Sequence, residues 1–445
     1  MTTYACELAW LPPGRVARGI RIEVLDGRIS AVTEDAGEGT GPRGELLPGL
    51  VLPGLANAHS HAFHRALRGR THEPTHGSFW SWREQMYAVA ARIDPDSYRA
   101  LARATFAEMA LAGVTCVGEF HYLHHGPDGT PYDDPNEMGL AVVEAAREAG
   151  VRITLLDSCY LTGGIGVPLE GVQRRFSDAD AQRWAARVDN LAKAVAAEDV
   201  VVAAAVHSVR AVPRDQLAAI GEWSRTAPLH VHLSEQAAEN EQCQLAYGVT
   251  PTRLLHDRGL LGPRTTAVHA THLGDDDVSL LGDASTYVCM CPTTERDLGD
   301  GIGPARRLRD AGCPLTLGSD SHAVIDLLEE ARTLELDERL ATGLRGHWAT
   351  AELVDAATAA GHASLGFPDA GRLEVGARAD LVAVRLDSVR TAGGGPDEAA
   401  TRVVFAAAAC DVTDVVASGR RVVSEGRHIL GDVGRLLEDA VAAVT

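Results

Sequence analysis

Four residues of the sequence are of the types that bind a divalent metal. His59 and His61 form an H-x-H pair at the end of an apolar run, and His232 and Asp320 lie at the ends of two later runs. Side chains at positions i and i+2 of a strand point the same way, so both imidazoles of the pair would face one side. Three neutral imidazoles and one carboxylate suit a metal such as zinc, with an open position for water. We therefore predict a metal site with these four ligands.

The His and Asp at the ends of later runs make this prediction more specific than the H-x-H pair alone would. An isolated H-x-H is more often two surface or core histidines than a metal site. The sequence also bears on the number of metals, because its one lysine, Lys193, lies in the helix-like segment LAKAVAAE. That lysine is not placed to become the carbamylated bridge that holds two metals in some barrel hydrolases. We expect one divalent metal, most readily Zn²⁺, while iron and manganese remain open.

Eight short β-rich runs carry these residues and alternate with helix-like segments. The runs are LVLPGLANAHSH, VTCVGEFHY, VRITLLDSCY, VVAAAVHSVR, LHVHLSEQ, TAVHATHL, STYVCMCP and PLTLGSDSH. Near-continuous apolar strands separated by helices indicate a parallel sheet that is buried on both faces. Eight such units predict an α/β fold of the (β/α)8 TIM-like barrel type, in which the carboxyl ends of the strands share one rim. Polar residues gather at those ends: His59, His61, Glu119, His207, His232, Glu235, His269 and Asp320.

The two ends of the chain have a different pattern. Residues 18–33 alternate as an antiparallel strand pair with a turn at Asp26 and Gly27, and residues 371–384 and 412–429 do likewise. We expect residues 1–52 and 366–445 to form a small β-sandwich domain that flanks a metal-dependent barrel domain of residues 53–365.

Composition limits the possible partners. The 445 residues include 61 Asp and Glu against 41 Lys and Arg, a net charge of −20, which argues against nucleic acid or an anionic membrane as partner. No run approaches the ~20 apolar residues of a membrane span, and the N-terminus lacks the pattern of a signal peptide. The eight scattered cysteines, including Cys289 and Cys291, are typical of reduced core residues. We expect a cytoplasmic protein, with a homodimer as the default assembly.

The strings GLANAHSHAFHRALRG, EFHYLHH, HVHLSEQ, HATHL and GSDSH resemble the amidohydrolase superfamily. The strings FWSWREQMY, EFHYLHH and HSVRAVP further resemble its formimidoylglutamate deiminases. This resemblance implies hydrolysis of N-formimidoyl-L-glutamate to N-formyl-L-glutamate and ammonia in histidine degradation. It implies zinc on the four predicted ligands and a catalytic pair, Glu235 and His269. It also implies substrate contacts from His64, Arg83, Tyr122, His207 and Arg210. These deiminases carry Gln at the position of His64, where this chain departs from them.

A mechanism follows from these residues as a hypothesis. Metal binding lowers the pKa of a water towards roughly 7. Glu235 would take a proton from this water and deliver it to the imino nitrogen, while His269 polarises the reacting centre or holds the hydroxide. Asp320 would help to move a proton. His269 as a second metal ligand is the alternative. The remaining histidines near these runs are expected to line the rim or face solvent: His124, His125, His272 and His322.

The implied substrate is a small, anionic amino-acid derivative with two carboxylates. Arginine pairs with carboxylates through its planar fork, which makes Arg83 and Arg210 the candidates. Two other functions stay open. One is a related deaminase that acts on a purine base or a guanidino or formimino acid, and the other is a metal-free binding protein on the same barrel.

Overall fold

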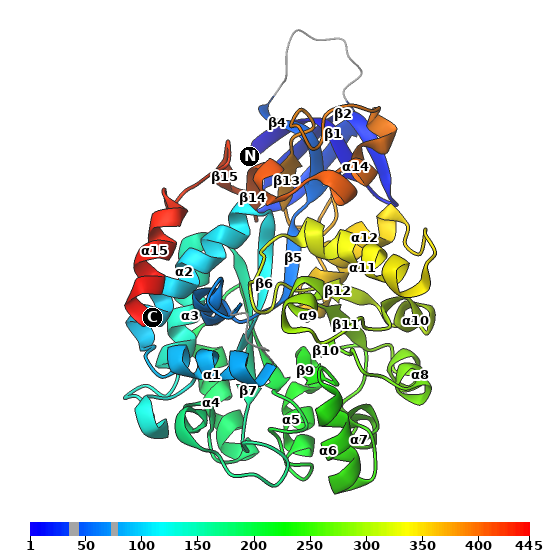
Figure 1. Ribbon diagram of the computed structural model, residues 1–445. Coiled ribbons are helices and arrows are strands. Elements are labelled where there is room, and N and C mark those ends of the chain that lie inside the picture. The colour runs from blue at the N-terminus through cyan, green and yellow to red at the C-terminus, as the bar shows by residue number, and fades with distance from the viewer. Residues whose placement is uncertain (35–43, 73–78) are drawn as a thin grey trace.

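The computed structural model describes residues 1–34, 44–72 and 79–445, and these form two sheets (Figure 1). The barrel sheet joins eight parallel strands in chain order: β5 (Leu55–Ser60), β6 (Val114–His121), β7 (Arg152–Cys159), β8 (Val200–Val206), β9 (Leu229–Leu233), β10 (Thr265–His269), β11 (Tyr287–Met290) and β12 (Leu315–Leu317). Every residue of β5, β6 and β7 is buried, as expected for strands covered on both faces. The predicted parallel barrel is confirmed.

The barrel closes at the place where the first and last strands carry metal-ligand residues. The backbone of Asp320, three residues beyond β12, donates to the carbonyl of His59 at 3.0 Å and accepts from the amide of His61 at 3.3 Å. Gly318 permits this approach, because a Cβ there would lie 2.7 Å from the Cβ of His59. Closure therefore brings the first-strand histidines and Asp320 together through the backbone itself.

Helices surround the barrel and are bounded by ordinary capping signals. The α2 helix (Pro95–Leu111) begins at Asp94, whose side chain accepts from the Ser97 amide, and has a proline in its first turn. The α3 helix (Glu137–Ala149) ends at the left-handed Gly150. The others are α1 (Phe79–Ala90), α4 (Ala181–Ala194), α5 (Leu217–Trp223), α6 (Ala237–Tyr247), α7 (Pro251–Asp257), α8 (Asp275–Asp283), α9 (Pro292–Leu298), α10 (Ala305–Asp310), α11 (Leu327–Thr342), α12 (Thr350–Ala357), α13 (Ala359–Ser364) and α14 (Ala399–Ala406), with α15 described below. In the described residues, none of the helices has the length and apolar character to span a bilayer.

Both chain ends build the second sheet, called the terminal sheet below, as predicted. Its strands run in the order β16-β15-β14-β13-β4-β1-β2-β3, so they form one continuous mixed sheet. The bounds are β1 (Thr2–Leu11), β2 (Arg15–Leu25), β3 (Arg28–Glu34), β4 (Glu45–Pro53), β13 (Leu381–Val384), β14 (Val412–Ala417), β15 (Arg420–Ser424) and β16 (Arg427–His428). The predicted turn at Asp26 and Gly27 is present, with φ values of 49° and 75°.

One predicted strand pair is wrong. Within residues 371–384, only β13 is a strand. Gly371 and Gly376 adopt φ of 80° and 91°, which turns the chain away from an extended conformation. The segment instead crosses the end of the β2–β3 hairpin, where the carbonyl of Ala377 accepts from the amide of Ile29 at 2.9 Å.

The junction between the two sheets lies inside one apolar run. Within LVLPGLANAHSH, β4 belongs to the terminal sheet and β5 to the barrel. A buried ion pair between Arg152 of β7 and Asp380 ties the two sheets together at 2.5 Å. The last helix, α15 (Val433–Val444), follows the last strand of the terminal sheet but lies beside the barrel helix α2 (Figure 1). The domain limits after residues 52 and 365 stay a prediction.

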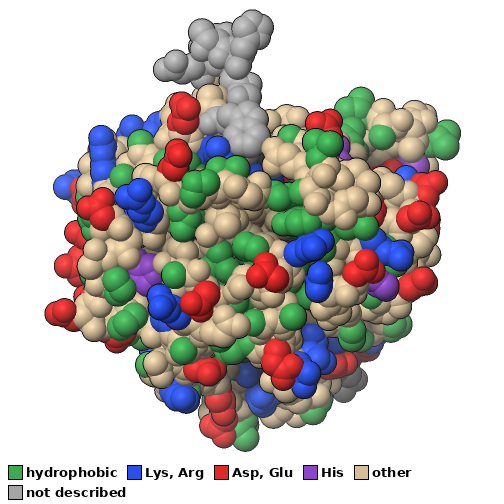
Figure 2. All heavy atoms as spheres, turned by 90° about the horizontal axis from the view of Figure 1, so that it is seen from below, with side chains coloured by type: hydrophobic (Ala, Val, Ile, Leu, Met, Phe, Trp, Pro, Cys, Tyr) green, Lys and Arg blue, Asp and Glu red, His purple; other side chains and the backbone are tan. Residues whose placement is uncertain are grey.

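The surface and the cysteines agree with the composition. On the face drawn in Figure 2, acidic and basic side chains are interspersed among apolar ones. Seven of the cysteines are buried and unpaired, including Cys289 and Cys291, while Cys410 is exposed. The prediction of core cysteines therefore holds for all but Cys410.

Candidate active site

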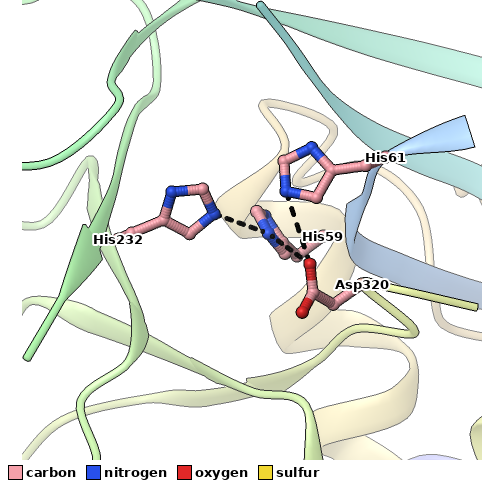
Figure 3. Close-up of side chains that lie close together, drawn as sticks. All are labelled: His59, His61, His232 and Asp320. Atoms are coloured by element: carbon pink, nitrogen blue, oxygen red, sulfur yellow. Dashed lines mark hydrogen bonds and ion pairs between the residues drawn. The ribbon is translucent and has the colours of Figure 1, made fainter. Parts of the chain in front are cut away.

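The four predicted metal ligands meet at the carboxyl ends of the barrel strands (Figure 3). Nε2 of His59 lies 3.1 Å from Nε2 of His232 and 3.2 Å from Oδ1 of Asp320. Nε2 of His61 lies 3.4 Å from the same carboxylate oxygen. All four side chains are buried. The cluster therefore gathers three imidazoles and one carboxylate around a common point.

The outer hydrogen bonds determine which ring nitrogen faces this point. Nδ1 of His61 lies 2.8 Å from the Phe120 carbonyl, and Nδ1 of His232 lies 2.9 Å from the His207 carbonyl. A carbonyl only accepts, so each Nδ1 carries the proton and each Nε2 presents a lone pair. Backbone carbonyls hold metal-binding histidines in this way in many sites. These residues therefore fit a divalent metal, which would relieve the repulsion between the converging lone pairs.

Burial sets the charges of the cluster. It lowers the pKa of His59 to about 3, and it lowers the pKa of His61 and His232 as well, so the imidazoles stay neutral. Burial opposes the charge of Asp320, but His59 and the neighbouring histidines hold the pKa of this carboxyl well below its usual range. Neutral imidazoles with an ionised carboxylate are the form that binds a metal.

The predicted catalytic pair borders this cluster. Nε2 of His269 lies 4.0 Å from Oε1 of Glu235 and 3.9 Å from Oδ2 of Asp320. Nδ1 of His269 lies 3.4 Å from Glu295 on α9. Burial disfavours a charge on His269, but these carboxylates raise its pKa well above the usual value. His269 also lies outside the group of four side chains whose ligand atoms are within 4.8 Å of one another, which favours the catalytic role over that of a second ligand.

One pocket contains the five predicted substrate contacts together with Glu235, His269 and Asp320. His64, Arg83, Tyr122, His207 and Arg210 all line it. Nε2 of His64 lies 2.8 Å from the hydroxyl of Tyr122, and Nε of Arg210 donates to Glu239 at 3.2 Å. Strand ends of β6 and β8 bring Tyr122, His207 and Arg210 to the pocket, while α1 brings Arg83.

Several residues of the site were not predicted as part of it. Trp82, Tyr87, Tyr160 and Phe176 supply aromatic walls to the pocket. Their segments follow the strands at varying distances, so no fixed spacing marks them. Glu239 lies on α6, shortly after the strand end that carries His232 and Glu235, and Glu295 lies on α9, shortly after β11. Their position close behind a strand is the one signal in the sequence that could have indicated them.

Glu119, noted at a strand end, lies behind the metal ligands. Its carboxylate accepts from the Ser60 hydroxyl at 2.6 Å and from the Ala62 amide at 2.7 Å. Burial raises its pKa to about 8. On the other side, Nε2 of His322 lies 3.2 Å from Oγ of Ser60. These contacts fix the backbone between His59 and His61, so Glu119 and His322 support the metal ligands from outside.

The expectation that the remaining histidines lie at the rim or in solvent is wrong for three of them. His124, His125 and His322 are 1%, 3% and 0% exposed. Each bonds a buried neighbour, as His124 does through Nε2 to the Ser158 carbonyl at 2.8 Å. His272 is half-buried. His124 and His125 lie in the space between the barrel and its helices. The pattern of polar strand ends cannot distinguish residues in this space from residues that line the pocket.

A second group of metal-ligand types lies in that space, formed by His121, His124 and Asp157. Here a cation is already present. Arg187 of α4 donates to both oxygens of Asp157, at 2.7 and 2.9 Å, and Trp184 adds a third hydrogen bond at 3.0 Å. The guanidinium neutralises the carboxylate that a metal would need. We therefore assign no metal to this group.

Comparison with known proteins agrees with this geometry. The model of the amidohydrolase family matches residues 50–422. Formimidoylglutamate deiminase of Pseudomonas aeruginosa is 36% identical over 440 residues, covering 96% of each chain. A crystal structure of an amidohydrolase from Brucella melitensis superposes with a TM-score of 0.91 at 34% identity, covering both chains fully. Atrazine chlorohydrolase of Arthrobacter aurescens, complexed with zinc, shares the fold over all of both chains with a TM-score of 0.87 at 24% identity.

The family match spans the whole barrel and parts of the terminal sheet, and the predicted metal ligands lie at the strand ends within it. The chain belongs to the amidohydrolase family.

Proposed function

We propose that this protein is a deiminase that hydrolyses N-formimidoyl-L-glutamate to N-formyl-L-glutamate and ammonia. The observation that carries the proposal is the placement of two arginines, Arg83 and Arg210, in the pocket that holds Glu235 and the metal ligands. The overall similarity to the Pseudomonas aeruginosa deiminase supports it. A purine base has no carboxylates for these arginines, so the pocket favours a linear diacid over the related deaminase substrates.

The metal would be held by His59, His61, His232 and Asp320, and zinc suits this ligand set. When bound there, a divalent metal lowers the pKa of water and supplies hydroxide near neutral pH. The zinc in the structure of the related Arthrobacter aurescens hydrolase supports this choice.

Glu235 is the proton carrier in this proposal. It follows the ligand His232 by three residues, and burial raises the pKa of its carboxyl although His269 and Arg210 oppose the shift. A raised pKa brings the carboxyl closer to neutral pH, where a group can both accept and release a proton. Its carboxylate would take the proton of the attacking water and pass it to the imino nitrogen. The hydroxyl proton of the tetrahedral carbon would then move to the same nitrogen as the carbon–nitrogen bond breaks, so that ammonia leaves and a formamide remains.

His269 would stabilise the charge that develops at the reacting carbon. Its Nε2 lies between Glu235 and Asp320, and Glu295 holds the opposite nitrogen. His269 itself has a φ of 69°, an uncommon conformation for a residue with a side chain. This conformation occurs at the point where the chain leaves β10, and it fixes the direction of the imidazole.

Arg210 and Arg83 would bind the two carboxylates of the substrate, with His207 and Tyr122 donating further hydrogen bonds. Burial lowers the pKa of His207 well below its usual value and raises that of Tyr122 well above, so both side chains are neutral partners. The net charge of −20 would repel a dianion at long range. The local arginines must therefore supply the attraction.

The deciding experiment measures ammonia release from N-formimidoyl-L-glutamate, guanine and adenosine, with metal content determined on the same sample. We expect clear turnover of the first compound alone and about one metal per chain. Turnover of a purine without turnover of the diacid would assign the protein to the related deaminases. A metal-free protein that binds ligands without turnover would be the binding protein.

A further inference from the structure

Glu239 is a buried carboxylate that contacts the pocket residue Arg210, and the proposed mechanism does not use it. It lies in the first turn of α6, four residues after Glu235, and is 1% exposed. Its Oε2 accepts a hydrogen bond from Nε of Arg210 at 3.2 Å. A buried carboxylate is costly unless a charged partner compensates it. The pairing with Arg210 supplies that compensation and ties this residue to the proposed substrate site.

Arg210 lies between two carboxylates. Its Nε faces Glu239 at 3.2 Å, and its Nη2 lies 3.9 Å from Oε2 of Glu235. Side-chain exposure is 13% for Arg210, 8% for Glu235 and 0% for Glu239, so water screens these charges poorly. Both carboxylates therefore attract the same guanidinium, and the shorter contact is the one with Glu239.

The balance between the two contacts matters for the chemistry. If Arg210 closed onto Glu235, the ion pair would favour the ionised carboxylate and hinder its role as proton carrier. The guanidinium would also turn away from the position where it meets the substrate. Glu239 of α6 binds the Nε edge of Arg210, and this contact opposes a movement of the guanidinium towards Glu235.

We propose that Glu239 is a positioning residue that holds Arg210 away from Glu235 and directs its guanidinium towards a carboxylate of the substrate. This inference rests on the proposed function. It assigns to Glu239 no contact with the substrate and no proton transfer. Glu239 acts only through Arg210, so its substitution should have no further effect on the kinetics once Arg210 is replaced.

The test is a double-mutant cycle of Glu239→Gln and Arg210→Met, assayed with N-formimidoyl-L-glutamate. In Glu239→Gln, Glu235 becomes the nearest carboxylate to Arg210 among the residues that the structure describes, so we expect KM to rise about tenfold to a hundredfold and kcat to fall less. The double variant should match Arg210→Met, because Glu239 has no guanidinium left to position. Glu239→Asp keeps the charge and should recover part of the loss. Glu239→Asp is also the variant to measure if Glu239→Gln does not fold.

Glu241→Gln is the matched control, since Glu241 is an exposed residue of the same helix and should leave kinetics unchanged. A second readout is calorimetric binding of N-formyl-L-glutamate, which should weaken in Glu239→Gln by the same factor as KM rises. Additive losses in the double variant, or an unchanged KM in Glu239→Gln, would overturn the inference while the proposed function stands. A parent protein without turnover of the substrate would overturn both.

Discussion

Two buried clusters of the barrel contain the same kinds of residue and differ in the cation that they accommodate. The first joins His59, His61, His232 and Asp320 inside the barrel mouth, and the second joins His121, His124 and Asp157 between the barrel and its helices. Burial keeps the imidazoles of both neutral, and it lowers the pKa of His124 to about 4. Protonation therefore does not distinguish them.

The carboxylates distinguish the clusters. Asp320 has histidines as its close polar partners, whereas Asp157 accepts two hydrogen bonds from Arg187. A guanidinium in the second cluster supplies the positive charge that a metal would supply in the first. Metal-ligand types at close range are thus not enough to assign a metal, and the charges already present around the carboxylate must be considered.

Loss of a first-cluster ligand should have the largest effect. We expect Asp320→Ala to lose its metal and to release ammonia from N-formimidoyl-L-glutamate at the background rate, because three imidazoles without the carboxylate bind a divalent metal far more weakly. Elemental analysis and the ammonia assay test this. His124→Asn is the comparison, and it should keep the full metal content. A drop of one metal per chain in His124→Asn would show that the second cluster also binds a metal.

Glu235→Gln should separate metal binding from proton transfer. We expect an unchanged metal content with turnover lower by about 10²–10⁴-fold, which is the usual contribution of a general acid–base. The amide has nearly the shape of the carboxyl but cannot carry the proton. The two measurements are made on the same sample, and substantial activity in this variant would show that another group moves the proton.

Arg187→Met should affect stability rather than chemistry. The side chains of Arg187 and Asp157 are 6% and 0% exposed, and removal of one partner leaves an uncompensated buried charge. We expect the free energy of unfolding to fall by about 3–5 kcal/mol, measured with urea. Arg183→Met is the control on the same helix, because Arg183 is exposed and should cost little. A similar stability for both variants would mean that Arg187 is not the essential cation of the second cluster.

The same comparison explains how far the sequence could predict the site. His59, His61, His232 and Asp320 end strands of one barrel, so the periodicity of the chain predicted both the fold and their convergence. His124 ends a strand segment too, but its side chain lies outside the barrel, and the pattern of strand ends alone did not show this. Arg187 is in the middle of a helix-like segment, where an arginine is usually a surface residue, so nothing in the sequence marked it as buried.

The parts that were missed depend on contacts between distant segments. Glu239 gains its significance from Arg210, which lies 29 residues earlier and on another element. Residues 371–380 alternate like a strand, yet two glycines with positive φ and the hydrogen bonds to the β2–β3 hairpin direct this segment elsewhere. Local pattern predicts an element only where tertiary contacts do not compete with it.

Arg210→Met should weaken substrate binding in the barrel mouth without disturbing the metal. A charged hydrogen bond contributes about 1.5–3 kcal/mol, so we expect KM to rise roughly tenfold to a hundredfold with the metal content unchanged. Steady-state kinetics with N-formimidoyl-L-glutamate measure this effect. Arg214→Met is the matched control, because Arg214 packs on the ring of Tyr247 outside the pocket residues. Equal effects of the two variants would show that Arg210 does not contact the substrate as proposed.

The smallest effect is expected at His64, where this chain departs from the resemblance. Nε2 of His64 lies 2.8 Å from the Tyr122 hydroxyl, and its ring packs against Trp82 and His61. Burial lowers the pKa of His64 well below its usual value, so the imidazole is neutral and a glutamine amide can replace its hydrogen bond to Tyr122. We expect His64→Gln to change kcat/KM by less than about fivefold, within the ~1 kcal/mol of one neutral hydrogen bond. A larger change would mean that the imidazole itself contacts the substrate, and that the pocket is adapted to a different diacid.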